Sequence, residues 1–276
     1  MKIVSYLKKR KQFNKIIRDI KSIKIQGAKA VAEKALYAYF LFPSERTKKR
    51  LLSLRPTEPL LRRVLAKAKY LSYKKIISHF SFSQNKINKY AFRLIKNKDV
   101  IFTHCHSSTV VEALIYAKKN KKYFEVYNTE TRPLFQGRKT LRELNKAGIK
   151  VTSFVDSAIE VALKKEQGTK KVNKIFLGAD AILKEGALNK IGSGVITQLA
   201  QDNKIPVYIL ADSWKYSSKP IQIEERNPRE VWKKLFRKSK IENPAFELIP
   251  KKQIKAIVSE IGILTYDEFL KKVKKV

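Results

Sequence analysis

The spacing of apolar residues changes near residue 99, and this change limits the folds that the chain can adopt. Before it, apolar residues recur at helical spacing, as in Ile16, Ile20 and Ile23, and no strand signal appears. After it, short apolar runs alternate with helical patterns. We therefore predict an all-helical N-terminal domain over residues 1–97 and a second domain over residues 98–276.

Three helices are predicted at the start of the first domain: over residues 1–22, from Ala28 through Phe40, and from near Thr57 onward. Gly27 precedes the second of them, and a glycine at a helix start lets backbone N–H groups approach an anion closely. Pro59 suits a first helical turn because its missing N–H would have no partner there. The helical pattern continues to residue 97, and we predict a break near the polar run 81–85.

Five short apolar runs of the second domain predict strands, over residues 100–103, 123–128, 151–155, 174–178 and 206–211. A helical pattern follows the first of them, and further helices are predicted over residues 141–148, 159–165 and 191–203. This alternation predicts an α/β fold, with a Rossmann-like parallel sheet, right-handed crossovers and helices on both faces. From Tyr216 onward we expect irregular chain that becomes partly helical.

Polar residues gather where each predicted strand ends, in the clusters 103–107, 129–133, 156–157, 178–181 and 212–215. Any one cluster could be a solvated loop. The carboxyl ends of parallel strands, however, lie at one edge of the sheet, where ligands bind in open α/β folds. Five clusters in phase with the strands therefore predict one common pocket.

The only cysteine, Cys105, lies in the first cluster between His104 and His106. A thiol at a strand-to-helix junction can have its pKa lowered by the helix N-terminus and by a charged neighbour. The alternative is a buried structural cysteine that packs as a small hydrophobe. We expect the two histidines to pack and orient their neighbours and not to bind a metal. We predict no metal site.

The chain has 61 basic and 24 acidic residues, which give a formal net charge of +37. Such a balance suits nucleic acid, an anionic membrane or phosphorylated small molecules. Nucleic acid ranks lowest because no basic and aromatic module is recognisable, and most of the lysines lie on helical patterns that suit solvated faces. One cysteine excludes a disulfide framework and a cysteine-built zinc site. With no signal peptide and no membrane-length apolar run, we expect a cytoplasmic protein without a membrane partner.

Between residue 23 and about residue 265, short stretches of the sequence match those of one family and occur in the same order. They are Gly27–Ala28, Arg55–Thr57, Thr103–Ser107, Glu130–Pro133 with Gln136–Arg138, Gly178–Asp180, Asn189–Gly192, Ala211–Tyr216 and Asn243–Phe246. The chain thereby resembles the family that joins the α, β and δ subunits of initiation factor 2B with two sugar-phosphate isomerases. Cys105 together with Asp180 favours the isomerases, because the initiation-factor subunits generally lack one or both.

Within that family, His106-Ser107 and the segment Trp214–Tyr216 look most similar to the archaeal ribose-1,5-bisphosphate isomerases. The resemblance implies an aldose–ketose isomerase of nucleotide (AMP) salvage, with no cofactor and with assembly into a homo-oligomer, a dimer or a hexamer. It implies that Cys105, as a thiolate, handles the proton on carbon and that Asp180 carries the oxygen-bound protons. Two alternatives stay open: a regulatory protein like the initiation-factor subunits that binds a sugar phosphate or nucleotide, and a methylthioribose-1-phosphate isomerase.

A sugar bisphosphate carries about four negative charges near neutral pH. The family-matched groups that would hold it are Gly27, Ala28, Arg55, Arg132, Asn189, Lys190 and Lys215. Gln26 departs from the pattern, because the isomerases commonly have Arg there, so phosphate affinity at that end is in question; Lys24 or Lys29 would have to compensate. Asp156 is a further candidate, either as a helix cap or as a group of the pocket or a dimer contact.

Overall fold

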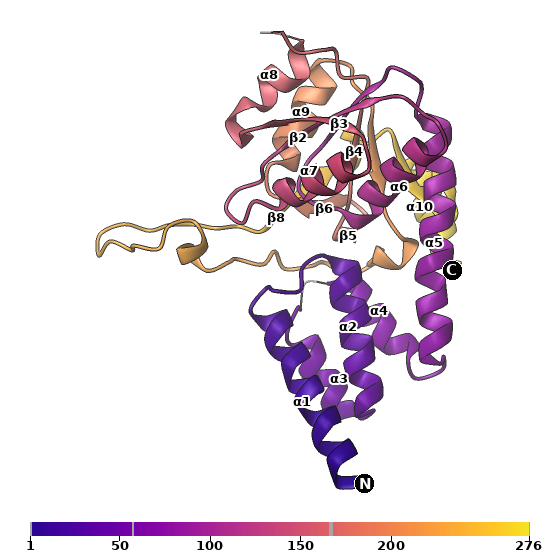
Figure 1. Cartoon of the computed structure of the whole chain (residues 1–276), viewed down its shortest axis with the longest axis vertical. Helices are drawn as coiled ribbons and strands as arrows, with labels where there is room; N and C mark the ends of the chain where they lie inside the picture. Colours follow the sequence, from indigo (N-terminus) through magenta and orange to yellow (C-terminus); the bar gives the residue numbers. More distant parts are fainter. Residues whose placement is uncertain (1, 57, 166–167, 276) are drawn as a thin grey trace.

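The computed structural model describes residues 2–56, 58–165 and 168–275, and side chains from residue 5 onward within them. The N-terminal part is helical (Figure 1), with α1 (Lys2–Lys21), α2 (Ala28–Leu41), α3 (Glu45–Leu52), α4 (Pro59–Lys67) and α5 (Tyr73–Leu94). Helix α2 begins where the sequence predicts it, after Gly27 with φ +83°, a value that favours glycine. Thr57, the predicted start of α4, lies outside the described residues, and Pro59 is the first residue of that helix.

Helix α5 is continuous, so the predicted break near residues 81–85 is wrong. Polar side chains in this run are buried and have tertiary partners that replace solvent. Ser83 donates to Glu260 at 3.1 Å, and the Gln84 amide donates to Asn88 and to the Thr109 carbonyl at 2.7 and 3.1 Å. A polar run therefore marks a contact with other elements here, and it does not interrupt the helix.

The second part is a seven-stranded sheet in the order β10-β9-β7-β4-β1-β2-β3. Its strands are β1 (Val100–Thr103), β2 (Glu125–Thr129), β3 (Lys150–Phe154), β4 (Lys174–Leu177), β7 (Val207–Leu210), β9 (Ala256–Ser259) and β10 (Gly262–Leu264). All neighbouring pairs are parallel except β9 with β10. The predicted fold class, helices followed by a mostly parallel Rossmann-like sheet, is confirmed, and so are the five predicted strands within one or two residues at each end.

Successive strand residues face opposite sides of this sheet and pack into two cores. Ile101 lies in a core with α5, α6 (Ser108–Lys119) and α7 (Gln136–Lys146). Phe102 lies in the other core, with α8 (Ile159–Lys164), α9 (Ser193–Asp202) and α10 (Tyr266–Val273). Helix α5 also packs its first half among α2 and α4. The division into domains at residue 97 therefore stays a prediction, since α5 contributes to cores on both sides of it.

The sequence did not reveal the strands of the C-terminal part. A small sheet has the order β5-β6-β8, from β5 (Ala181–Ile182), β6 (Gly186–Lys190) and β8 (Phe246–Pro250). Together with β9 and β10 it corrects the expectation of an irregular and then helical tail. These strands are two to five residues long, and β6 pairs with β8 across about 60 residues. Patterns this short do not predict pairing partners so distant in the chain.

Residues 217–245, here called the arm, connect the short segment after β7 to β8. Figure 1 shows the arm (orange to yellow) extending away from the sheet and from the N-terminal helices. Its two ends meet at a bridge between Glu225 and Pro244. Its outer part exposes large apolar side chains: Trp232 is 58% exposed, Leu235 46% and Phe236 43%. None of the helices among the described residues is long and apolar enough to cross a membrane.

Candidate active site

A cavity of about 400 Å³ opens at the carboxyl ends of β1 and β4, facing α2 and the start of α4. The strand order reverses direction between β1 and β4, since β2 and β3 lie on one side and β7 and β9 on the other. Loops that leave such a switch point in opposite directions leave a crevice between them. A pocket is therefore present at the strand ends, with a second wall made by the helical part. Three of the five predicted clusters line it, 103–107, 178–181 and 212–215, whereas no described residue of 129–133 or 156–157 does.

The cavity brings together nine of the eleven site residues expected from the sequence: Gln26, Gly27, Ala28, Arg55, Cys105, Asp180, Asn189, Lys190 and Lys215. Arg132 and Asp156 are not among the described residues that line it. The lining also includes charged and polar residues that the sequence analysis missed: Glu58, Gln136, Lys139, Arg142 and Arg226.

Cys105 is held in a left-handed backbone conformation, φ +63°, by hydrogen bonds on both sides. Its N–H donates to the Thr131 hydroxyl at 3.0 Å, and its carbonyl accepts from the Thr140 hydroxyl at 2.8 Å. A non-glycine residue in this conformation is strained, and such strain persists where the surroundings fix it. The next loop fits closely, because a Cβ on Gly178 would lie 2.5 Å from the Ser107 hydroxyl.

The pKa of Cys105 is raised to about 12, mainly by burial. A backbone hydrogen bond from His106 and the charge of Lys190 act in the opposite direction but do not overcome burial. The sequence had suggested a thiol whose pKa is lowered at the start of α6. Burial reverses that expectation, because it penalises the charged thiolate more than the nearby positive groups stabilise it. At neutral pH Cys105 is therefore an uncharged thiol.

Asp180 follows β4, and its N–H donates to the Leu188 carbonyl of β6 at 2.8 Å. Burial raises the pKa of its carboxyl, against the lowering effect of Lys215, Arg55 and other cations. Burial acts in this direction on any carboxyl, because it disfavours the charged form. Asp180 is therefore a group that can hold a proton and release it to a partner inside the cavity.

Strand β6 supplies two predicted binding groups side by side in the chain. The Asn189 amide donates to the Ser193 hydroxyl at 2.9 Å. Lys190 is 7% exposed, and no hydrogen bond or ion pair joins its ammonium to another residue within the described ranges. Burial lowers the pKa of Lys190. A buried ammonium with no fixed partner, beside a thiol, is available to an incoming anion.

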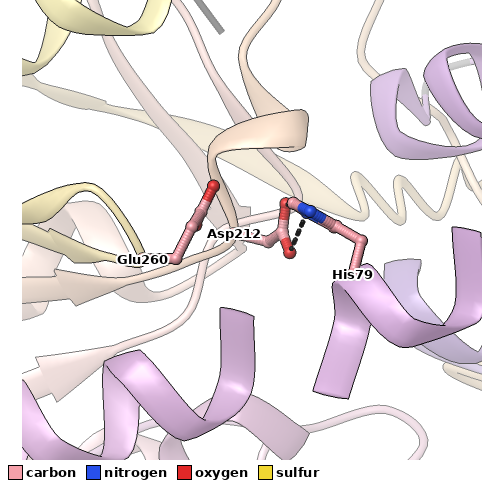
Figure 2. Close-up of side chains that lie close together, drawn as sticks. All are labelled: His79, Asp212 and Glu260. Carbon is pink, nitrogen blue, oxygen red and sulfur yellow. Dashed lines mark hydrogen bonds and ion pairs between the residues drawn. The ribbon is translucent and has the colours of Figure 1, made fainter. Parts of the chain in front are cut away.

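Lys215 is positioned by a polar network behind the cavity. Its ammonium donates to the Ala179 carbonyl at 2.5 Å. His79 of α5 fixes the turn before Lys215. The His79 ring bonds to the Asp212 carboxylate at 3.1 Å (Figure 2). The same ring stacks on Trp214, with the ring centroids 3.5 Å apart. Glu260 accepts from the Ser213 backbone N–H at 3.1 Å.

His79, Asp212 and Glu260 also lie close enough together to suggest a metal site, with candidate ligand atoms within 4.8 Å of one another. Each of the three groups already has protein partners, however, because the carboxylates accept hydrogen bonds from backbone N–H groups and from the His79 ring or Ser213. A satisfied network of this kind rigidifies its surroundings without an ion. We interpret the cluster as the support of the turn that carries Lys215.

Arg55 is buried, and its Nη1 donates to both carboxylate oxygens of Glu224 of the arm, at 2.6 and 2.9 Å. The Arg226 Nε lies 3.1 Å from the same carboxylate. The predicted phosphate ligand Arg55 thus already holds a carboxylate. No local pattern pairs residues 169 positions apart.

Two predicted residues support the site from outside the cavity. Asp156 accepts from the backbone N–H groups of Thr131 and Arg132 at 2.9 and 2.6 Å. Asp156 thereby fixes the turn whose Thr131 hydroxyl holds Cys105. The Arg132 guanidinium is exposed and donates to the Val231 carbonyl of the arm at 3.3 Å. The binding roles given to these two residues by resemblance stay predictions.

The histidines beside Cys105 are engaged in hydrogen bonds. His104 is 2% exposed and bonds to the Thr129 hydroxyl at 2.5 Å and the Ile191 carbonyl at 2.9 Å. His106 bonds to Glu143 at 3.1 Å. Burial lowers the pKa of both rings. Both arrangements agree with packing and orienting roles.

The model of the initiation factor 2 subunit family matches residues 49–266, and the chain belongs to that family. Ribose 1,5-bisphosphate isomerase of Archaeoglobus fulgidus is 36% identical over 199 residues, which cover 69% of this chain and 62% of that protein. The enzyme of the same name from Thermococcus kodakarensis is 30% identical and covers 92% of this chain and 91% of the other.

A solved structure has the same fold along nearly the whole chain. The crystal structure of translation initiation factor eIF-2B from Pyrococcus horikoshii has a TM-score of 0.79 at 23% identity, over 92% of this chain and 96% of the other. This similarity concerns the fold alone. The match to the Archaeoglobus enzyme spans somewhat less than two thirds of that relative's length.

Proposed function

We propose that the protein is an isomerase that converts ribose 1,5-bisphosphate to ribulose 1,5-bisphosphate without a cofactor. The observation that carries the proposal is the presence of Cys105 and Asp180 on one cavity at the switch point of the sheet, each with a raised pKa. The names of relatives that match most of the chain support the same substrate.

The reaction opens the sugar ring and relocates hydrogen, with no net oxidation or reduction. The ring C1–O bond breaks, and the ring oxygen gains a proton. The hydrogen on C2 moves to C1, and the C2 hydroxyl loses its proton as the carbonyl forms. No electron acceptor or donor is needed, so the chemistry requires one group for oxygen-bound protons and one group at carbon.

Asp180 suits the first role because burial favours its protonated form. As the acid it gives a proton to the ring oxygen, and as the resulting carboxylate it takes the proton of the C2 hydroxyl. Cys105 suits the role at carbon. Its thiol must first ionise, and Lys190 is the cation whose charge favours the thiolate. Asn189 is placed to hold a sugar hydroxyl.

Two phosphates require several cationic or N–H donors. The first residues of α2 offer backbone N–H groups at a helix start, behind Gly27. Lys190 has no fixed partner among the described residues, and Arg142 and Lys139 lie on the wall formed by α7. Gln26 lines the cavity without a charge, and Lys24 and Lys29 line it nearby, which supports compensation at that end.

The test is isomerase turnover of ribose 1,5-bisphosphate, measured beside Cys105→Ser, Asp180→Asn and the control Asp202→Asn at the exposed end of α9. We expect turnover in the wild type and the control, and a loss of at least about 10³-fold in both site variants, as for removal of an essential acid or base. Binding of the bisphosphate without turnover would reject the enzyme and favour the regulatory alternative. Turnover of methylthioribose 1-phosphate alone would favour the other isomerase.

We also propose that the protein is a homo-oligomer, with a dimer or a hexamer as the candidate states. The support is the arm, which extends away from the rest of the chain (Figure 1) and exposes Trp232, Leu235 and Phe236. Exposed apolar groups gathered in this way are typical of protein contacts. Light scattering after gel filtration tests this, and a monomer at micromolar concentration would reject it.

A further inference from the structure

Glu58 is a buried carboxyl on the cavity wall that the proposed reaction does not use. Glu58 lies directly before α4 and is 2% exposed. The structure describes every residue of α4, and the Glu58 side chain makes no capping hydrogen bond to this helix. Its Oε2 atom is buried and has no hydrogen-bond partner among the described residues. A carboxyl that neither caps its helix nor satisfies its own oxygen costs free energy, and such a cost is typical of functional sites.

Charged groups surround Glu58 from each element packed against it. Asp180 after β4 and Glu224 of the arm oppose its ionisation, whereas Arg55 and Lys215 favour it. The charge of Arg55 is already engaged by Glu224 through two short contacts. Burial, which disfavours the carboxylate, has a larger effect on Glu58 than any one of these neighbours.

As a result, the pKa of Glu58 is raised to about 8, first by burial and second by Asp180. Because the raised value lies above neutrality, the carboxyl is mostly protonated at pH 7 and ionises as the pH rises through 8. A protonated carboxyl has an O–H donor, whereas a carboxylate only accepts. The protonated form can therefore donate a hydrogen bond to an anion in the cavity, whereas the carboxylate repels that anion.

We propose that Glu58 is a substrate-binding residue, which as a neutral acid forms a hydrogen bond with the anionic ligand and as a carboxylate excludes it. The inference rests on the proposed function for the identity of the ligand, a phosphorylated sugar. Glu58 lines the same cavity as Arg55 and Gly27, and this lining has Gln26 in place of a cation. As a neutral donor, Glu58 forms a hydrogen bond with the ligand and adds no negative charge to the cavity.

The test measures the affinity for ribose 1,5-bisphosphate and for inorganic phosphate by calorimetry between pH 6.5 and 9. It uses the Cys105→Ser protein, in which substrate persists, with and without Glu58→Gln, Glu58→Leu or the exposed control Glu160→Gln. If only the protonated form binds, Kd rises about tenfold from pH 7 to pH 9 for an ionisation near 8.

Glu58→Gln keeps a donor and cannot ionise, so we expect its Kd at pH 7 to stay within about threefold and the alkaline rise to shrink by about tenfold. Glu58→Leu loses the donor, and we expect binding weaker by about tenfold at pH 7. Burial lowers the pKa of Lys190, and any effect of its titration on binding is common to every variant. The difference between the parent and the Glu58→Gln protein therefore isolates the Glu58 carboxyl.

The inference would be overturned if Kd had the same pH dependence in the parent and Glu58→Gln proteins. It would also be overturned if neither ribose 1,5-bisphosphate nor inorganic phosphate bound. Wild-type turnover, assayed separately, distinguishes the two proposals. Turnover with no Glu58 effect rejects only the role of Glu58. A Glu58-dependent pH effect on binding without wild-type turnover rejects only the isomerase. Thermal denaturation of each variant checks that the fold persists.

Discussion

The two walls of the cavity differ in how their charged and polar groups are satisfied. The strand wall carries Cys105 and Asp180, and backbone hydrogen bonds fix both residues. The helix wall carries Arg55, which pairs with Glu224 of the arm, and Glu58, whose Oε2 atom has no hydrogen-bond partner among the described residues. Proton-handling groups therefore stand on a rigid frame, whereas anion recognition depends on ion pairs with which a ligand must compete.

Lys190 gives the sharpest test of the strand wall. Lys190→Met removes the cation that favours the Cys105 thiolate and a phosphate contact, so we expect kcat/KM to fall by about 10²-fold. The measurement is isomerase turnover over a range of substrate, with the exposed Lys184→Met as the matched control. Equal losses in both variants would mean that only the overall positive charge matters.

Loss of the hydrogen bond that holds the Cys105 backbone should have the next largest effect on turnover. Thr131→Val keeps the shape but removes the acceptor of the Cys105 N–H, so the left-handed turn relaxes. We expect kcat to fall by about tenfold with KM nearly unchanged, because misplacing a reacting group slows chemistry more than binding. A change in KM alone would show that Thr131 contacts substrate and does not position Cys105.

A change on the helix wall is expected to strengthen anion binding, whereas the changes on the strand wall reduce turnover. Glu224→Gln removes the carboxylate that occupies Arg55, so we expect inorganic phosphate to bind a few-fold more tightly. Without ligand the variant should be less stable by about 1–3 kcal/mol, because Arg55 is then buried without its partner. Thermal unfolding with and without phosphate measures both effects, and a weaker affinity for phosphate would mean that Arg55 needs Glu224 to bind.

The network behind Lys215 should affect turnover least. His79→Ala removes the ring stacked on Trp214 and the bond to Asp212, and we expect a loss of about 2 kcal/mol in the free energy of unfolding. With Lys215 still bonded to Ala179, kcat should change by no more than a few-fold. Chemical denaturation and turnover assays measure the two quantities. If a chelator abolished the activity of the wild type and a divalent metal restored it in full, the result would instead support a metal site.

The sequence predicted the frame and most of the strand wall, because both depend on local patterns. The change of period near residue 99 located the sheet, and parallel strands necessarily place their carboxyl ends at one edge. The residues after β1 and β4 therefore had to approach each other, and Cys105 and Asp180 do line one cavity. Gly27 at the start of α2 was likewise a local signal, since its left-handed φ suits glycine.

Only the tertiary structure decided the remaining features, since they depend on contacts between distant segments. Burial sets the protonation of Cys105 and Glu58, and no local pattern reports how deeply a side chain is enclosed. The arm brings Glu224 to Arg55 across 169 positions. The same physical reason explains the continuous helix α5, in which Ser83 and Gln84 find partners from other elements in place of water.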